Sequence, residues 1–136
     1  PTLETFAELQ NLGGPIEDYI LIDEELFFSV NQSVDKILYR YNQAEGLREI
    51  TKNTSGFNSF ESRDNYLYFV DKGASQRIFQ YDLNAKTIQQ VFKDPESGSS
   101  VEIKDLVVVD NFLYAIAKNY GFPPVSRLLK ISLADF

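Results

Sequence analysis

The chain has 136 residues, of which 43% are hydrophobic and 14% aromatic, and its formal net charge is −7. This length and composition suffice for one hydrophobic core, so we expect a single domain over residues 1–136. The negative charge disfavours nucleic acid and anionic membrane surfaces as partners. No signal peptide and no apolar span of about 18 residues occurs in the sequence.

Four residue types are missing, because the chain has no Cys, His, Trp or Met. Without Cys or His it cannot form a Ser-His-Asp or Cys-His catalytic site, or a Cys/His zinc or haem site, from its own side chains. Only carboxylate, lysine, tyrosine or hydroxyl chemistry remains, and because no pattern in the sequence supports it, we expect no enzyme, no cofactor and no metal site. The lack of Cys leaves the redox compartment and the localisation open. The missing first Met suggests a processed chain, an excised domain or a piece of a longer protein.

One sequence block recurs three times, and each copy reads Asp, two variable residues, Leu and an aromatic residue. Asp64 follows Asp23 by 41 residues, and Asp110 follows Asp64 by 46. A second block with the alternation of a half-buried strand follows each copy. Copies of the first block are 23–28, 64–69 and 110–115, and copies of the second are 38–42, 78–82 and 128–132.

Each repeat contains two further strand patterns. A first strand precedes each Asp, and a third block follows the second in the first two repeats. Four short strands in about 40 to 50 residues are typical of a propeller blade, so the predicted fold is all-β, with about three four-stranded antiparallel β-propeller blades. The first strands are expected at 19–22, 58–62 and 105–109, the third blocks at 47–50 and 88–91, and the repeats at approximately 15–53, 56–94 and 101–136.

Two details of the repeats carry structural expectations. The aspartates Asp23, Asp64 and Asp110 lie where a two-residue hairpin turn favours Asp, Asn or Gly. The run 106–109 is apolar throughout. Such a run predicts an innermost strand that is covered on both faces.

Residues 2–9 resemble the third block, and we expect them to form an outer strand that completes a blade. Three blades should not close into a ring, because propellers typically have four to eight. Either the chain is a segment of a larger propeller, or two copies form a six-bladed ring as a head-to-tail homodimer. The first of these alternatives is slightly favoured.

Two stretches carry a resemblance to a known family: 37–42 with 47–53, and 66–70 with 78–83. They resemble the repeats of six-bladed TolB-like bacterial propellers, and the resemblance covers essentially the whole chain. The Trp-Asp ending of WD40 blades and the double glycine of kelch blades are absent. The resemblance implies a binding or scaffold platform and carries no catalytic residue.

The connection 118–127 is longer than its counterparts and combines aromatic residues with a Pro-Pro pair. Loops at blade ends usually carry the function of a propeller. Rigid exposed aromatic residues are typical of binding hot spots, so Tyr120, Phe122, Pro123 and Pro124 are the predicted partner-binding residues. The alternative is that Phe122 packs on the blade and the prolines stiffen an insertion.

Two acidic features point to other chemistry. Residues 93–100 offer oxygen ligands for Ca²⁺, but their spacing matches no calcium loop, so we expect a solvated connector. The pairs Glu17-Asp18 and Glu24-Glu25 provide carboxylates of the kind that glycoside hydrolysis needs. Neighbouring residues of a strand point to opposite faces, so these pairs should not converge.

The sequence therefore predicts a non-catalytic binding or scaffold module that recognises a macromolecular partner, preferably a protein, through blade-end loops. A glycan-binding or glycan-cleaving propeller is the alternative from another class. A third hypothesis is an architectural segment whose partner is the remaining blades of its own chain. In that case the aromatic residues of the second strands would pack against those blades.

Overall fold

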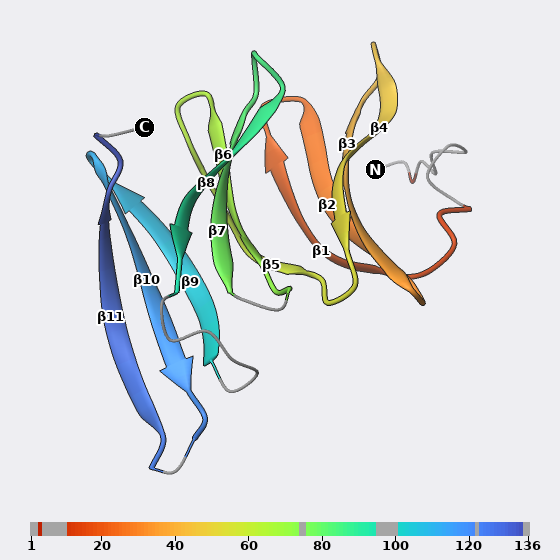
Figure 1. Ribbon diagram of the computed structural model, residues 1–136. Helices are drawn as coiled ribbons and strands as arrows, with labels where there is room; N and C mark the ends of the chain where they lie inside the picture. The colour runs from red at the N-terminus through yellow and green to blue at the C-terminus, as the bar shows by residue number, and fades with distance from the viewer. Residues whose placement is uncertain (1–2, 4–10, 74–75, 95–100, 122, 135–136) are drawn as a thin grey trace. The chain divides into compact units, whose positions relative to one another are not determined.

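The computed structural model describes residues 3, 11–73, 76–94, 101–121 and 123–134. These residues form eleven strands in three antiparallel sheets (Figure 1), and they contain no helix. The predicted all-β class is therefore confirmed. The chain divides into two compact units, Pro1–Gly56 and Phe57–Phe136, which are described one after the other.

The first unit holds one four-stranded sheet, in which each strand pairs with the next along the chain. Phe28 and Val30 of this sheet are buried in a small core with Leu12, which precedes the first strand. The Phe28 ring lies 5.6 Å from that of Tyr39, centroid to centroid. The strands are β1 (Ile16–Ile22), β2 (Glu25–Gln32), β3 (Asp35–Asn42) and β4 (Gly46–Asn53).

The second unit holds two sheets, one of four strands and one of three. Both repeat the hairpin order of the first unit. The four-stranded sheet consists of β5 (Phe57–Arg63), β6 (Tyr66–Asp71), β7 (Arg77–Asp82) and β8 (Thr87–Lys93). The three-stranded sheet consists of β9 (Val101–Val109), β10 (Phe112–Asn119) and β11 (Val125–Ser132), with β11 at its edge.

The first hairpin of every sheet turns at the predicted aspartate. Asp23, Asp64 and Asp110 have φ values of 54°, 54° and 52°, in the left-handed region that few residue types adopt. Each is followed by one further turn residue before the second strand begins. The prediction that these aspartates are turn residues is confirmed.

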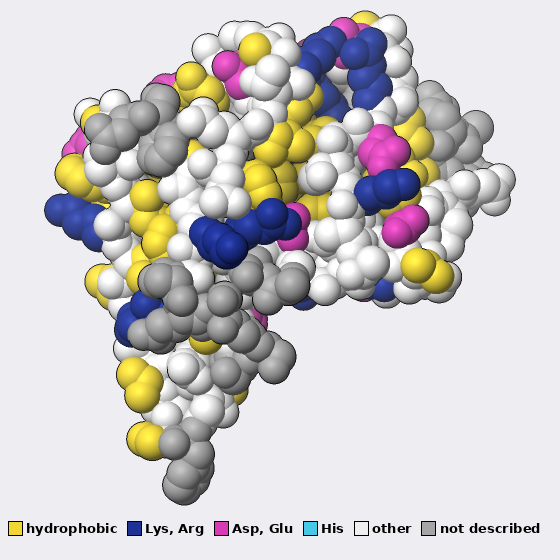
Figure 2. All heavy atoms as spheres, viewed as in Figure 1, with side chains coloured by type: hydrophobic (Ala, Val, Ile, Leu, Met, Phe, Trp, Pro, Cys, Tyr) yellow, Lys and Arg dark blue, Asp and Glu magenta, His cyan; other side chains and the backbone are white. Residues whose placement is uncertain are grey.

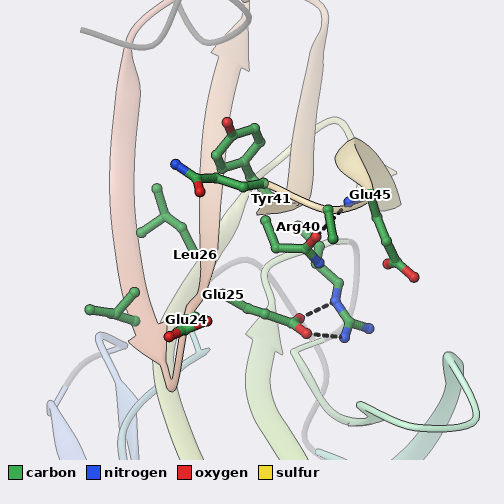
Figure 3. Close-up of a pocket in the computed structure, with 10 residues that line it drawn as sticks. Glu24, Glu25, Leu26, Arg40, Tyr41 and Glu45 are labelled. Carbon is green, nitrogen blue, oxygen red and sulfur yellow. Dashed lines mark hydrogen bonds and ion pairs between the residues drawn. The ribbon is translucent and has the colours of Figure 1, made fainter. Parts of the chain in front are cut away.

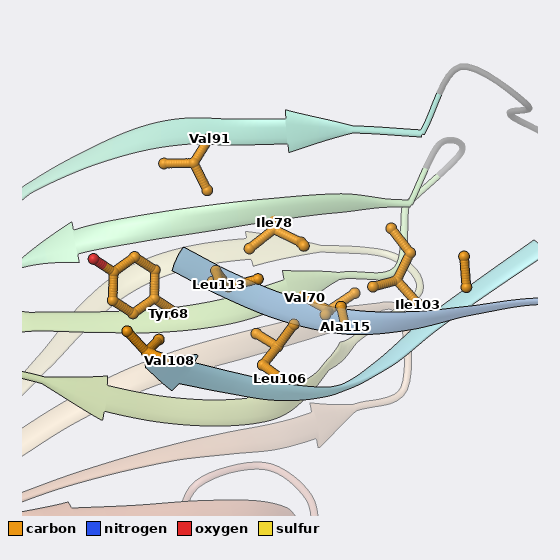
Figure 4. Packing of buried hydrophobic residues seen from close by; sticks show 10 residues of the cluster. Tyr68, Val70, Ile78, Val91, Ile103, Leu106, Val108, Leu113 and Ala115 are labelled. Atoms are coloured by element: carbon orange, nitrogen blue, oxygen red, sulfur yellow. The ribbon is translucent and has the colours of Figure 1, made fainter. Parts of the chain in front are cut away.

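The two sheets of the second unit pack face to face around one hydrophobic core (Figure 4). The β5–β8 sheet contributes Tyr68, Val70 and Ile78, and the β9–β11 sheet contributes Leu106 and Leu113 among others. All five side chains are buried. Because apolar area removed from water stabilises a fold by roughly 25 cal/mol per Å², this cluster holds the two sheets together.

Each first strand of the second unit contains a bulge, and a hydrogen bond joins the two bulges. Ser59 of β5 and Asp105 of β9 both have positive φ, at 55° and 58°. The strand register shifts beside each of them. The Asp105 amide donates to Ser59 Oγ at 3.0 Å, so the bulges connect the two sheets.

One prediction from the sequence about β9 is wrong. The run 106–109 was expected to be covered on both faces, but Leu106 and Val108 are buried while Val107 and Val109 are each 49% exposed. Residues of a strand alternate between its faces, and only the face toward β5–β8 is covered. The predicted outer strand at 2–9 lies outside the described residues apart from Leu3.

Candidate functional site

The predicted binding loop connects β10 to β11. Asn119 ends β10, and its side-chain oxygen accepts a hydrogen bond from the Gly121 amide at 2.8 Å. A Cβ at Gly121 would lie 3.0 Å from that oxygen, so glycine allows the tight turn. Tyr120 between them is 57% exposed, and Pro123 and Pro124 are also exposed. The turn therefore presents the Tyr120 side chain to solvent.

Three of the four predicted binding residues thus lie exposed in one connection. Tyr120, Pro123 and Pro124 all precede the first residue of β11, Val125, which is itself 53% exposed. The fourth, Phe122, lies outside the described residues. Pro123 and Pro124 have fixed φ angles, which reduces the entropy lost when such a loop binds a partner.

Two lysines lie beside this loop, and the sequence analysis did not identify them. Lys104 of β9 and Lys118 of β10 are diagonal neighbours across the two strands, because Lys118 pairs with Glu102 and Lys104 pairs with Ile116. Their amines are within hydrogen-bonding reach of each other. The bulge at Asp105 shifts the register, and this shift brings the two lysines to the same face of the sheet.

The lysine pair has unusual acid–base properties. The hydrogen bond to Lys104, followed by repulsion from its charge, lowers the pKa of Lys118. The same hydrogen bond raises the pKa of Lys104, and Tyr120 adds to that rise. The carboxylates of Glu102 and Asp105 raise the pKa of both lysines, so the pair lies close to negative charges of the chain itself.

The first unit has a surface pocket of about 860 Å³ (Figure 3). The pocket lies at the end of the β1–β4 sheet that carries the β1–β2 turn and the β3–β4 turn. Glu25 and Arg40 on its wall form a bidentate ion pair, with Arg40 Nη2 donating to Glu25 Oε1 at 2.7 Å. The remaining lining residues are Leu21, Glu24, Leu26, Tyr41, Asn42, Gln43, Ala44 and Glu45.

The acidic pairs of the sequence, which were expected not to converge, differ in their surroundings. Glu24 and Glu25 both border the pocket, because Glu24 lies in the β1–β2 turn, where strand alternation does not separate the two, and Glu25 is bound to Arg40. In the other pair, Glu17 accepts a hydrogen bond from Asn31, and Asp18 accepts one from the Tyr19 amide. These carboxylates are held by different local partners.

In the acidic connector after β8, the first carboxylate, that of Asp94, has a structural role. Asp94 is fully buried, and Arg127 of β11 donates to its Oδ2 at 2.8 Å. Residues 95–100 lie outside the described part of the chain. Across the residues that are described, no group of three or more Asp or Glu side chains is arranged to hold a metal ion.

Comparison of the chain with known protein families and with curated proteins finds no match. The resemblance to TolB-like propellers therefore stays a prediction. Within the described ranges, no helix is of the length and hydropathy needed to cross a membrane.

Proposed function

We propose that this chain forms blades of a β-propeller and acts as a non-catalytic module that binds a protein partner through the β10–β11 loop. The observation that carries the proposal is the exposed Tyr120 side chain, presented by a closed turn and followed by two exposed prolines. Aromatic residues on rigid loops dominate the binding energy of protein interfaces.

The sheet arrangement supports the propeller part of this proposal. Each sheet follows the chain order of its strands, and the repeat begins at the same Asp turn each time. In the second unit, two such sheets pack face to face through their first strands. Antiparallel sheets of four strands that stack in this way are the building unit of propellers.

The charge beside the loop suggests the chemistry of the partner. Lys104 and Lys118 lie near Tyr120 on a chain whose net charge is −7, and they place two amines there beside the carboxylates of Glu102 and Asp105. A carboxylate of the partner would be attracted to the lysines while an apolar side chain packs on the tyrosine ring. The best candidate partner is therefore a protein segment with acidic residues next to an apolar one.

Selection from a displayed random peptide library tests the proposal. We expect wild-type protein to enrich peptides that contain acidic and apolar residues. Tyr120→Ala should weaken the selected peptides about tenfold or more, because truncating a hot-spot aromatic costs over 1 kcal/mol. Val34→Ala removes part of another exposed side chain, in the β2–β3 turn, and should leave binding unchanged. No enrichment, or equal binding by Tyr120→Ala, would overturn the proposal.

A second candidate function is glycan binding in the pocket of the first unit. The observation that favours it is a pocket of about 860 Å³ whose lining includes Glu24, Glu45 and Asn42. Carboxylate and amide groups suit sugar hydroxyls. Binding on a glycan array that is lost in Glu24→Gln, with peptide selection unaffected, would favour this function.

A further inference from the structure

The second unit shows how one sheet of this chain covers another. The β5–β8 sheet offers Tyr68, Val70 and Ile78, which are called here the receiving positions. Leu106 and Val108 of β9 are buried against them and are called the inserting positions (Figure 4). The two sheets meet mainly through their first strands, β5 and β9.

The receiving positions recur on the β9–β11 sheet, where no part of the second unit covers them. Ile116 pairs with Leu128 as Val70 pairs with Ile78, and both Val70 and Ile116 lie six residues after the turn aspartate of their own sheet. Ile78 is 0% exposed and Leu128 is 74% exposed. Hydrophobic side chains reach the surface along β10 and β11 (Figure 2).

The inserting positions recur on β1. Leu106 and Val108 lie four and two residues before the turn aspartate of their sheet, and Tyr19 and Leu21 lie four and two residues before theirs. The first two are 5% and 6% exposed, whereas Tyr19 and Leu21 are 67% and 65% exposed. The chain therefore carries one open receiving face and one open pair of inserting positions.

The two open surfaces also differ in charge. The strand register puts Lys104, Lys118 and Lys130 on the receiving face of β9–β11, with Glu102 as the only acidic residue of its paired positions. The face of β1–β4 that carries Tyr19 instead has Asp35 and Glu49, with Lys52. Opposite signs favour the encounter of these two surfaces, and like signs disfavour each surface meeting itself.

We propose that the open face of β9–β11 binds the β1 face of a second copy of this chain, in the way that β5–β8 receives β9–β11. Such a contact uses different patches on the two copies, so it is heterologous. It gives a closed ring only if the rotation that relates the two copies returns to the first copy. Each copy has three sheets, so two copies supply six, and rings of propellers typically have four to eight blades. This inference rests on the proposed blade architecture, but not on the loop binding a partner.

Light scattering on the full chain tests the proposal. We expect wild-type protein to have about twice the chain mass of 15.6 kDa. Leu128→Glu and Tyr19→Lys each put a repelling charge on one of the two surfaces, and each should halve the mass. Val34→Glu changes an equally exposed residue, 73% exposed in the β2–β3 turn, and should leave the mass unchanged.

Mixing the two variants distinguishes this contact from a symmetric one. A mixed pair has one contact in which both surfaces are wild type, so Leu128→Glu and Tyr19→Lys together should recover a dimeric mass that neither has alone. A monomeric wild type, a dimeric Tyr19→Lys variant, or no recovery on mixing would overturn the proposal. Tyr120→Ala should keep the dimer, so failure of the loop proposal would be recognised separately.

Discussion

The two sheets of the second unit have the same strand pairing but different burial. In β6, five consecutive residues from Leu67 to Asp71 are buried. In β10, buried residues alternate with half-buried ones from Phe112 to Ala117. Continuous burial means that both faces of a strand are covered, and alternation means that only one is.

The open positions of β10 nevertheless have the residue types of the covered positions of β6. Tyr114 and Ile116 occupy the positions of Tyr68 and Val70, and they retain apolar character although they are only half-buried. Apolar residues therefore stay accessible on this face among its lysines, and accessible apolar residues that group together mark interaction surfaces.

Removing the ion pair between the sheets should have the largest effect on stability. Arg127 of β11 binds the fully buried Asp94 that follows β8. Arg127→Ala takes the guanidinium away from a buried carboxylate, which should lower the free energy of unfolding by about 4 kcal/mol. Urea unfolding measures the loss.

The control for this variant is an exposed ion pair. Arg48 Nε lies 3.7 Å from Glu45 Oε2, and the two side chains are 46% and 34% exposed. Arg48→Ala should change the free energy of unfolding by no more than about 0.5 kcal/mol. Equal effects of Arg48→Ala and Arg127→Ala would contradict the role of the buried pair.

Truncating one leucine on each face of the β9–β11 sheet should sharpen the comparison directly. Leu113 is fully buried toward β5–β8, and Leu113→Ala should cost about 3 kcal/mol through lost burial and a cavity. Leu128→Ala on the open face should cost no more than about 0.5 kcal/mol. Both are compared by urea unfolding in the Tyr19→Lys background, where we expect a monomer. A cost at Leu128 close to that at Leu113 would mean that the open face is covered within one chain.

The sequence predicted most of the strands, because the alternating blocks and the Asp turns are local signals. It placed the start of β9 at Asp105, four residues after the observed start at Val101. The bulge at Asp105 explains this difference. Ile103 and Leu106 are both buried although they are three residues apart, so the period of two that marks a strand is broken there.

The candidate site was predicted less completely than the fold. Tyr120, Pro123 and Pro124 were found because an unusual loop composition is visible in the sequence alone. The Lys104–Lys118 pair depends on strand register, which a bulge shifts, and neither lysine is unusual by itself. The Glu25–Arg40 ion pair likewise joins residues of two different strands, β2 and β3. Only the register of these strands shows that the two residues lie close together.

The smallest expected effect concerns the acid–base chemistry of the lysine pair on the open face. The pKa of Lys118 is lowered from the ordinary lysine value of 10.5, and that of Lys104 is raised. A lower pKa means a larger fraction of neutral amine at any pH below the ordinary value. Limited acetylation at such a pH should therefore modify Lys118 faster than Lys104, as measured by peptide mass spectrometry.

The variant Lys104→Gln tests the cause of this difference in reactivity. It removes the hydrogen bond and the charge that lower the Lys118 pKa, so acetylation of Lys118 should slow toward that of an ordinary lysine. The difference between the lysines should shrink only when the pH exceeds the raised pKa of Lys104, where both amines are largely neutral. Faster acetylation of Lys104, or a Lys118 rate that Lys104→Gln leaves unchanged, would show that the two amines do not interact in solution. The positive charge near Tyr120 would then be spread over two independent lysines, and a partner carboxylate would gain less from binding between them.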